Sequence, residues 1–349
     1  MATYEGVIEA VGLEDYCTAE AGGGPMTMAE LMARAQGGGS ETASAPETSI
    51  WDLPFPSLDA LNRDCAPIPR TRDMTDAVEQ GFLAIKSGLK TVLDPITAPL
   101  GWALDASLEF FQWVPWFVMI PALVLLTWFA SRSGKVTALV AATLLFFGFI
   151  DHYIYAVQTL SIIFVCTLFS ILLGVPIGIA MSRSNALQRA MIPVLDTLQT
   201  LPTFVYLVPL IYLFSVTESR LYGIAIILYA IVPVIRLTDL GIRLVDKDVI
   251  EAADAFGMTS SQKLNRVQIP LALPNIMAGI NQTIMMSLAM VVIASLVSAP
   301  GLGVLVLRGI RNLELGVGLV AGFCIVLLAI ILDRATKAAL GRIDASERG

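Results

Sequence analysis

The residues best suited to act on another molecule lie in a polar stretch, residues 246–274, between two apolar segments. Glu251 offers a carboxylate beside Ala252 and Ala253, whose small side chains let another protein approach closely. Gly257 follows four residues later, and glycine readily adopts the left-handed conformation that ends a helix. The stretch includes no nucleophile with a neighbouring base, so we expect no covalent chemistry there. Small side chains beside a carboxylate, in a polar stretch between two apolar segments, suit docking of another protein.

The same stretch predicts two short helices. Asp248 is placed to cap the first helix, with Glu251 three residues later reaching back to the backbone as in a capping box. Thr259 and Gln262 have the same spacing at the start of the second helix. We therefore expect a compact helix–glycine–helix loop.

Two prolines are expected to end the second helix. Pro270 and Pro274 lack the backbone N–H that a helix interior uses, and each restricts the residue before it. Apolar residues dominate after Pro274, so we expect the chain to return to a membrane there.

The spacing across this loop resembles a known motif. Glu251-Ala252-Ala253, three further residues, Gly257, and then Val267-Gln268-Ile269-Pro270 are similar to the EAA loop of binding-protein-dependent ABC importer permeases. Val267 and Ile269 stand where that family has Ile and Leu. A plain connecting loop is the alternative interpretation. The resemblance implies a set of residues that dock a cytoplasmic ATPase: Glu251, Ala252, Ala253, Gly257 and Pro270.

Five further stretches are similar to the glycine betaine/proline betaine permease subunits of osmoprotectant importers. They are LDTLQTLPTFVYLVPLIYLF (195–214), IVPVIRLTDLGI (231–242), IMAGINQTIMMSLAMVVIAS (276–295), GLGVLVLRGI (301–310) and LLAIILDR (327–334). The resemblance covers roughly residues 73–334. It implies an all-α polytopic membrane protein with the type I ABC importer permease fold. It also implies a permease homodimer, a separate ABC ATPase that binds ATP, and a soluble binding protein that delivers the substrate from outside.

Four aromatic residues are candidates for the translocation path. A quaternary ammonium group has no N–H to donate and is recognised best by aromatic faces. Phe204, Tyr206, Tyr212 and Tyr229 lie in or beside predicted spans and are placed to offer such faces. Ordinary aromatic packing and interfacial belts are the alternative and the more common reason for aromatic residues in spans.

Composition places these residues in a membrane protein. Hydrophobic residues make up 56% of the 349 residues and charged residues only 15%, whereas soluble proteins carry about 25% charged residues. Apolar runs predict about seven spans in a permease domain over residues 112–334: 113–130, 136–152, 155–181, 192–215, 221–237, 276–299 and 315–332. Gly174-x-x-x-Gly178 and Gly318-x-x-x-Gly322 offer close helix-packing faces within these spans.

The regions on either side of the spans are polar. Residues 1–72 are expected to be an acidic, largely disordered or irregular region, with too many prolines between Trp51 and Pro69 for a helix. Residues 73–111 predict an amphipathic helix on the membrane surface or against the bundle, broken at Asp94-Pro95. Residues 335–349 form a tail.

The four cysteines have no metal-site spacing. Cys166 and Cys324 lie in apolar runs and are expected to be packing residues. Cys17 and Cys65 would pair only in an oxidising compartment, and we expect two free thiols.

Basic residues orient the chain in an inner membrane. Lys and Arg are several-fold more numerous in the tail and in the loops after spans one, three and five than in the other loops. Because basic loops stay in the cytoplasm, the EAA-like loop and the C-terminus are expected inside. With seven spans, the N-terminus is then outside.

Several other functions are disfavoured. The acidic excess lies in the N-terminal region, residues 1–110, and this argues against nucleic-acid binding. The sequence contains no Gly-x4-Gly-Lys-Ser/Thr loop for ATP. We expect no catalytic residues, no metal and no cofactor of the chain's own. The substrate class stays open among betaines, choline, carnitine and amino acids. An ion-coupled secondary transporter and a membrane scaffold are more distant alternatives, and scarce charge within the spans weighs against the former.

Overall fold

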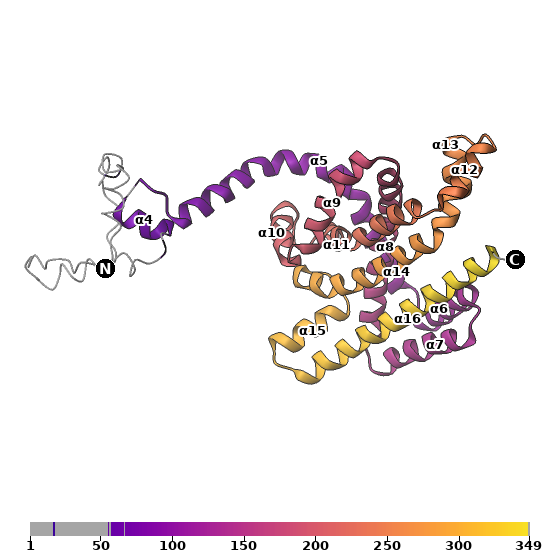
Figure 1. Cartoon of the computed structure of the whole chain (residues 1–349). Coiled ribbons are helices and arrows are strands. Elements are labelled where there is room, and N and C mark those ends of the chain that lie inside the picture. Colours follow the sequence, from indigo (N-terminus) through magenta and orange to yellow (C-terminus); the bar gives the residue numbers. More distant parts are fainter. Residues whose placement is uncertain (1–16, 18–54, 56, 66, 348–349) are drawn as a thin grey trace, which may run out of the picture. The chain divides into compact units, whose positions relative to one another are not determined.

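The computed structural model describes Cys17, Phe55, residues 57–65 and residues 67–347 (Figure 1). Every regular element in these residues is helical, as the sequence predicts. Contacts divide the chain into two units, Met1–Lys90 and Thr91–Gly349. The disorder expected for residues 1–16 and 18–54 lies outside the described residues.

The first unit contains a short helix that we did not expect, α4 (Leu58–Asp64). The Ser57 side chain caps it by accepting a hydrogen bond from the Ala60 N–H at 3.2 Å. The prediction of no helix between Trp51 and Pro69 is wrong, because the prolines flank these seven residues rather than interrupt them.

A disulfide joins Cys17 to Cys65. Cys65 is buried at the end of α4, where Leu61 and Ile68 pack around the pair. The expectation of two free thiols is therefore wrong. It rested on the polar sequence around Cys17, which gives no sign of the apolar pocket that surrounds its partner.

Helix α5 (Thr71–Trp113) runs without a break through Pro95 and Pro99. The predicted break at Asp94-Pro95 is wrong. In the second unit, Leu100 and Leu104 of this helix are buried, and Ser219 donates a hydrogen bond to the Gly101 carbonyl at 3.3 Å. Such packing can hold a helix together where prolines remove backbone donors.

The core of the second unit is formed by α8 (Tyr153–Arg183), α11 (Ser219–Arg243) and α14 (Ile269–Ala294). Gly174 and Gly178 of α8 face α11: a Cβ at Gly178 would lie 2.6 Å from Thr238 Cβ, and one at Gly174 would lie 2.5 Å from Val234 Cγ1. The predicted packing face at Gly174 and Gly178 is therefore confirmed.

The remaining elements of this unit surround the three core helices. Helix α16 packs against α6, α7 and α15. The close approach at Gly318 is to Gly309 of α15, while Gly322 faces open space. The bounds are α6 (Trp116–Ser131), α7 (Gly134–Phe149), α9 (Asn185–Thr200), α10 (Thr203–Leu213), α12 (Lys247–Ala255), α13 (Ser260–Lys263), η2 (Leu264–Gln268), η3 (Ser295–Val297), α15 (Leu302–Arg311) and α16 (Leu315–Glu347).

Four described helices are long and apolar enough to cross a membrane, over Tyr153–Arg183, Ser219–Arg243, Ser260–Val297 and Leu315–Ala339. Two bent pairs raise the number to six if each is one span: α5 with α6, bent by 112°, and α9 with α10, bent by 95°. The expected seven is thus above the range of four to six. Helix α7 has only 16 residues, and the predicted span 192–215 is broken at Leu201-Pro202.

Candidate functional site

Helix α12 opens the loop over residues 246–274, and Asp246 caps it. The Asp246 side chain accepts a hydrogen bond from the Asp248 N–H at 3.0 Å. The predicted cap at Asp248 with a reach-back from Glu251 is wrong. The two aspartates lie two residues apart, and the helix begins at the earlier one.

The turn after α12 has the predicted form. Gly257 has a φ of +72°, in the left-handed region that favours glycine. The Met258 N–H donates to the Ala253 carbonyl at 3.1 Å, which closes the end of α12. Thr259 and Gln262 then form the expected capping box at the start of α13.

The chain does not leave its helix at the two prolines. Helix α13 passes into the π turn η2 and then directly into α14, so residues 260–297 form one continuous helical segment. The prediction that Pro270 and Pro274 end the helix is wrong. Pro270 falls in the first turn of α14, where a missing N–H is tolerated, because the wide turn η2 ends just before it.

The loop presents one face and buries another. Glu251 and Ala252 are exposed, and the side chain of Phe256 next to the turn is 85% exposed. Ala253 is buried, so it packs inside the loop and does not belong to the predicted slim outer face. An ion pair between Asp254 and Lys263 ties α12 to α13.

An apolar cluster anchors the base of the loop to the core. Leu264 of η2 packs with Ile242 of α11 and with Ala272 and Ile276 of α14. Val175 and Ile179 of α8 lie against the same cluster. The base of the loop is therefore packed against all three core helices.

A polar network that we did not predict lies beside this cluster, at the last turn of α11. Asp239 is buried and accepts hydrogen bonds from Arg243 Nε at 2.8 Å and from Gln188 Nε2 at 2.6 Å. Arg243 also donates to Asn185 Oδ1 and to the Met181 carbonyl, each at 2.7 Å. The network joins α11 to the end of α8 and the start of α9. The signal in the sequence was an Asp and an Arg four residues apart in an otherwise apolar helix.

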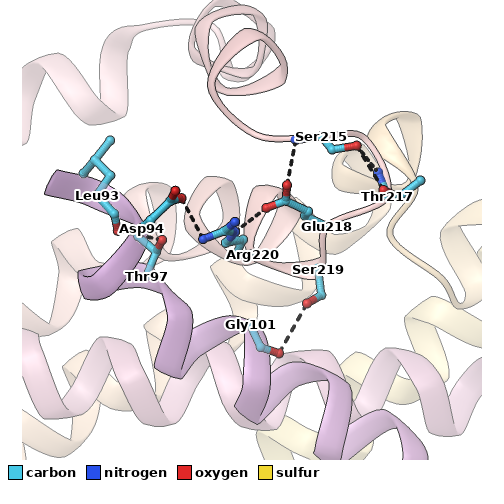
Figure 2. Close-up of polar contacts among 9 residues, drawn as sticks. All are labelled: Leu93, Asp94, Thr97, Gly101, Ser215, Thr217, Glu218, Ser219 and Arg220. Carbon is cyan, nitrogen blue, oxygen red and sulfur yellow. Dashed lines mark hydrogen bonds and ion pairs between the residues drawn. The ribbon is translucent and has the colours of Figure 1, made fainter. Parts of the chain in front are cut away.

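A second charged cluster lies at the first turn of α11 (Figure 2). Arg220 Nη1 lies 2.9 Å from an Asp94 carboxylate oxygen of α5, and Arg220 Nε is paired with Glu218. The guanidinium also sits over the Phe214 ring, 5.1 Å from its centroid. The cluster holds the C-terminal half of α5 and the loop before α11 together.

The four candidate path residues are not gathered at one point. Phe204 and Tyr212 of α10 are exposed, at 54% and 44%. Tyr206 of α10 is half-buried and its hydroxyl lies 3.7 Å from Met290 Sδ of α14. Tyr229 of α11 is half-buried and close enough to Tyr206 to interact with it electrostatically. The structure thus half-buries Tyr206 and Tyr229 and leaves Phe204 and Tyr212 on an open face. In the part of the chain that the structure describes, no three His, Cys, Asp or Glu side chains are grouped to hold a metal ion.

Comparison with known proteins agrees with these features. Residues 167–344 match the family described as "Binding-protein-dependent transport system inner membrane component". The "Glycine betaine/proline betaine transport system permease protein ProW" of Escherichia coli (strain K12) is 38% identical over 95% of this chain and 89% of its own length.

Two further relatives are also similar. The "Glycine betaine/carnitine transport permease protein GbuB" of Listeria monocytogenes is 42% identical over 70% of this chain and 87% of its own. The "Glycine betaine transport system permease protein OpuAB" of Bacillus subtilis (strain 168) is 40% identical over 73% and 86%. The chain therefore belongs to the family of binding-protein-dependent transport system inner membrane components and is a multi-pass protein of the inner membrane.

Proposed function

We propose that the chain is the permease subunit of an ABC importer for glycine betaine, proline betaine or a related quaternary amine. The observation that carries this proposal is the similarity to transport permeases whose names share glycine betaine, over 95%, 70% and 73% of the chain. The helix–glycine–helix loop, anchored to three core helices, supports it because an importer needs a place where its ATPase can act.

In this proposal a separate ABC ATPase docks on the loop. Glu251, Ala252 and the exposed ring of Phe256 meet the ATPase, while Ala253, Gly257 and Pro270 shape the loop that presents them. ATP is bound and hydrolysed by that partner. The permease holds no cofactor and catalyses no reaction.

The other partners act on the opposite side of the membrane. A soluble binding protein delivers the substrate to the loops after α10 and after α14, and two permease chains pair as a homodimer. The substrate passes aromatic faces that include Phe204, Tyr206, Tyr212 and Tyr229. Recognition of a quaternary ammonium by such faces is the supporting physical argument.

We infer that the N-terminus lies outside and the C-terminus in the cytoplasm. Termini on opposite sides need an odd number of crossings, so this proposal counts the 16-residue apolar helix α7 as a seventh span beside the six. Lys and Arg are more numerous in the loop over residues 246–274 and in the tail than in the loops assigned to the other side, which supports this orientation. The Cys17–Cys65 disulfide supports it as well, since disulfides persist in oxidising compartments.

The test is uptake of radiolabelled glycine betaine into proteoliposomes that contain the permease and its ATPase, with binding protein on the outside. We expect uptake that needs ATP, the ATPase and the binding protein, with competition by proline betaine, choline and carnitine ranking the substrates. Uptake driven by a sodium or proton gradient without ATP would instead identify a secondary transporter. An absence of uptake under every condition would favour a scaffold.

A further inference from the structure

An ion pair joins Arg236 of α11 to Asp196 of α9. Both side chains are accessible, at 39% and 53%. This is unusual for α11, because most of that helix is buried. The Arg236 Nε is buried and has no hydrogen-bond partner, so the guanidinium retains a donor that the pair does not use.

The pair differs from the neighbouring pair of Arg243 and Asp239. In that pair the other donors and acceptors are already used in hydrogen bonds with Gln188, Asn185 and the Met181 carbonyl. Charged side chains within spans are costly and face a partner, a cavity or an aqueous path. An ion pair whose two side chains both retain accessible surface is able to exchange partners.

An aromatic side chain lies on the same stripe of α11. Tyr229 precedes Arg236 by seven residues, which is two helical turns or about 10 Å along the helix. Both positions are half-buried on a helix whose other faces are packed. Tyr206 of α10 is close enough to Tyr229 to interact with it electrostatically. Tyr229 and Arg236 are therefore two half-buried positions on one side of α11, separated by the buried Val232 and Pro233, and the ion pair reaches from the second of them to α9.

A betaine has two charged ends, a quaternary ammonium and a carboxylate. Guanidinium groups bind carboxylates with two parallel hydrogen bonds, and a carboxylate attracts an ammonium. If a betaine enters between Arg236 and Asp196, each protein charge exchanges one opposite partner for another. No unpaired charge is created in a low-dielectric setting, where leaving one partner alone is strongly unfavourable.

We propose that Arg236 and Asp196 contact the carboxylate and the ammonium of the betaine as it passes α11, after the aromatic faces of Tyr206 and Tyr229. This inference rests on the proposed importer function and adds the residues that recognise a zwitterion. It predicts that the permease, and not only the binding protein, discriminates betaines from substrates without a carboxylate.

Charge exchange separates substrate recognition from a mere tie between α9 and α11. The test uses the complete complex in proteoliposomes, with Arg236→Lys, Asp196→Asn and the swapped double variant Arg236→Asp/Asp196→Arg. We expect each variant to lower kcat for glycine betaine uptake by about tenfold or more, with KM changed less because the binding protein delivers the substrate. The swapped variant keeps an ion pair but reverses its direction, so we expect no recovery.

The matched control is Lys337→Asp/Asp333→Lys, which reverses an ion pair within α16 that lies outside the candidate path and outside the proposed docking loops. This control is expected to leave uptake unchanged. Wild-type uptake by the swapped variant, or by Arg236→Lys and Asp196→Asn together, would overturn the inference and leave only a structural tie. If the swapped variant does not assemble, Arg236→Lys decides, because it keeps an ion pair with Asp196 but loses the forked guanidinium that binds a carboxylate with two hydrogen bonds; wild-type uptake by this variant would overturn the inference. A wild-type complex that imports no betaine would overturn the proposed function itself, and this inference with it.

Discussion

The first and last turns of α11 are each held by an arginine, but the two arginines have different surroundings. At the first turn, Arg220 pairs with Asp94 and Glu218, whose side chains are 37% and 27% exposed. At the last turn, Arg243 pairs with Asp239, which is 9% exposed and fully used by two donors. The first cluster joins α11 to α5 and a loop, whereas the second joins α11 to two neighbouring helices beside the EAA-like loop.

The difference indicates which end of α11 is the more rigid. Accessible ion pairs contribute little to stability and can rearrange. A buried carboxylate with two donors cannot lose one of them without leaving a polar group unsatisfied. We therefore expect the Arg243 end to move as one body with the loop, and the Arg220 end to adapt to whatever contacts it.

Labelling from one side of the membrane gives the largest effect, because it is all or none. Cysteines at Val216, before the Arg220 end, and at Glu79 are expected to react with an impermeant thiol reagent in intact cells. A cysteine at Ser261, in the loop beyond the Arg243 end, is expected to react only after permeabilisation. The native background is low, since Cys166 and Cys324 are buried and Cys17 and Cys65 are paired. Reaction of the Ser261 variant in intact cells would reverse the orientation and remove the docking argument.

Removing one acid from each end measures the difference in energy. Asp239→Ala leaves the Gln188 amide and the Arg243 guanidinium without their shared acceptor, so we expect the free energy of unfolding to fall by about 2–3 kcal/mol. Asp94→Ala removes a partly exposed partner, and we expect about 0.5 kcal/mol. Thermal unfolding of the detergent-solubilised permease checks both, with Asp239→Asn as the control that retains one acceptor. Equal losses at the two ends would contradict the comparison.

A backbone change in the loop tests whether the rigid end transmits force. A Cβ at Gly257 would meet no atom within 4 Å, so a side chain there strains only the left-handed backbone. We expect Gly257→Val to destabilise the turn by about 1–2 kcal/mol and to weaken ATPase co-purification and coupled uptake. Gly257→Asn should be milder, because asparagine tolerates this conformation. If the valine variant couples as the wild type does, the turn is not part of the coupling element.

The smallest expected effect distinguishes two roles of acidic residues in this loop, capping of helix α12 and contact with the ATPase. Asp246→Ala removes the cap of α12, which we expect to lower its stability by about 1 kcal/mol. Glu251→Ala leaves the cap in place and should leave α12 unchanged. Hydrogen exchange of the α12 amides measures this directly. Faster exchange in Glu251→Ala would show that its carboxylate supports the helix after all, while any change in ATPase binding without faster exchange reports a contact.

Local signals in the sequence predicted the local structure well. Gly257 and the Thr259–Gln262 box depend only on residues a few positions apart, and both predictions are confirmed. The packing face at Gly174 and Gly178 is confirmed. The signal is local, because two small residues four positions apart in an apolar helix allow a second helix to approach closely.

The errors share a different cause. Whether Pro95 or Pro270 breaks a helix depends on what packs around it, and the sequence does not show that. The partners of Asp239 are Arg243, visible four residues away, and Gln188, which lies 51 residues away and is brought close only by the fold.

The continuity of the helical segment over residues 260–297 gives the loop a mechanical property. These 38 residues form a column of about 57 Å, with the candidate ATPase contact at one end and the turn before α15 at the other. A column of hydrogen-bonded backbone resists compression, so a push at the loop displaces the far end instead of being absorbed on the way. Its most compliant point is the widened turn at Leu264–Gln268, where the backbone hydrogen-bond pattern changes. The compliance of that turn would then determine how a movement of the loop is divided between rotation of α14 and translation of α14 along its axis.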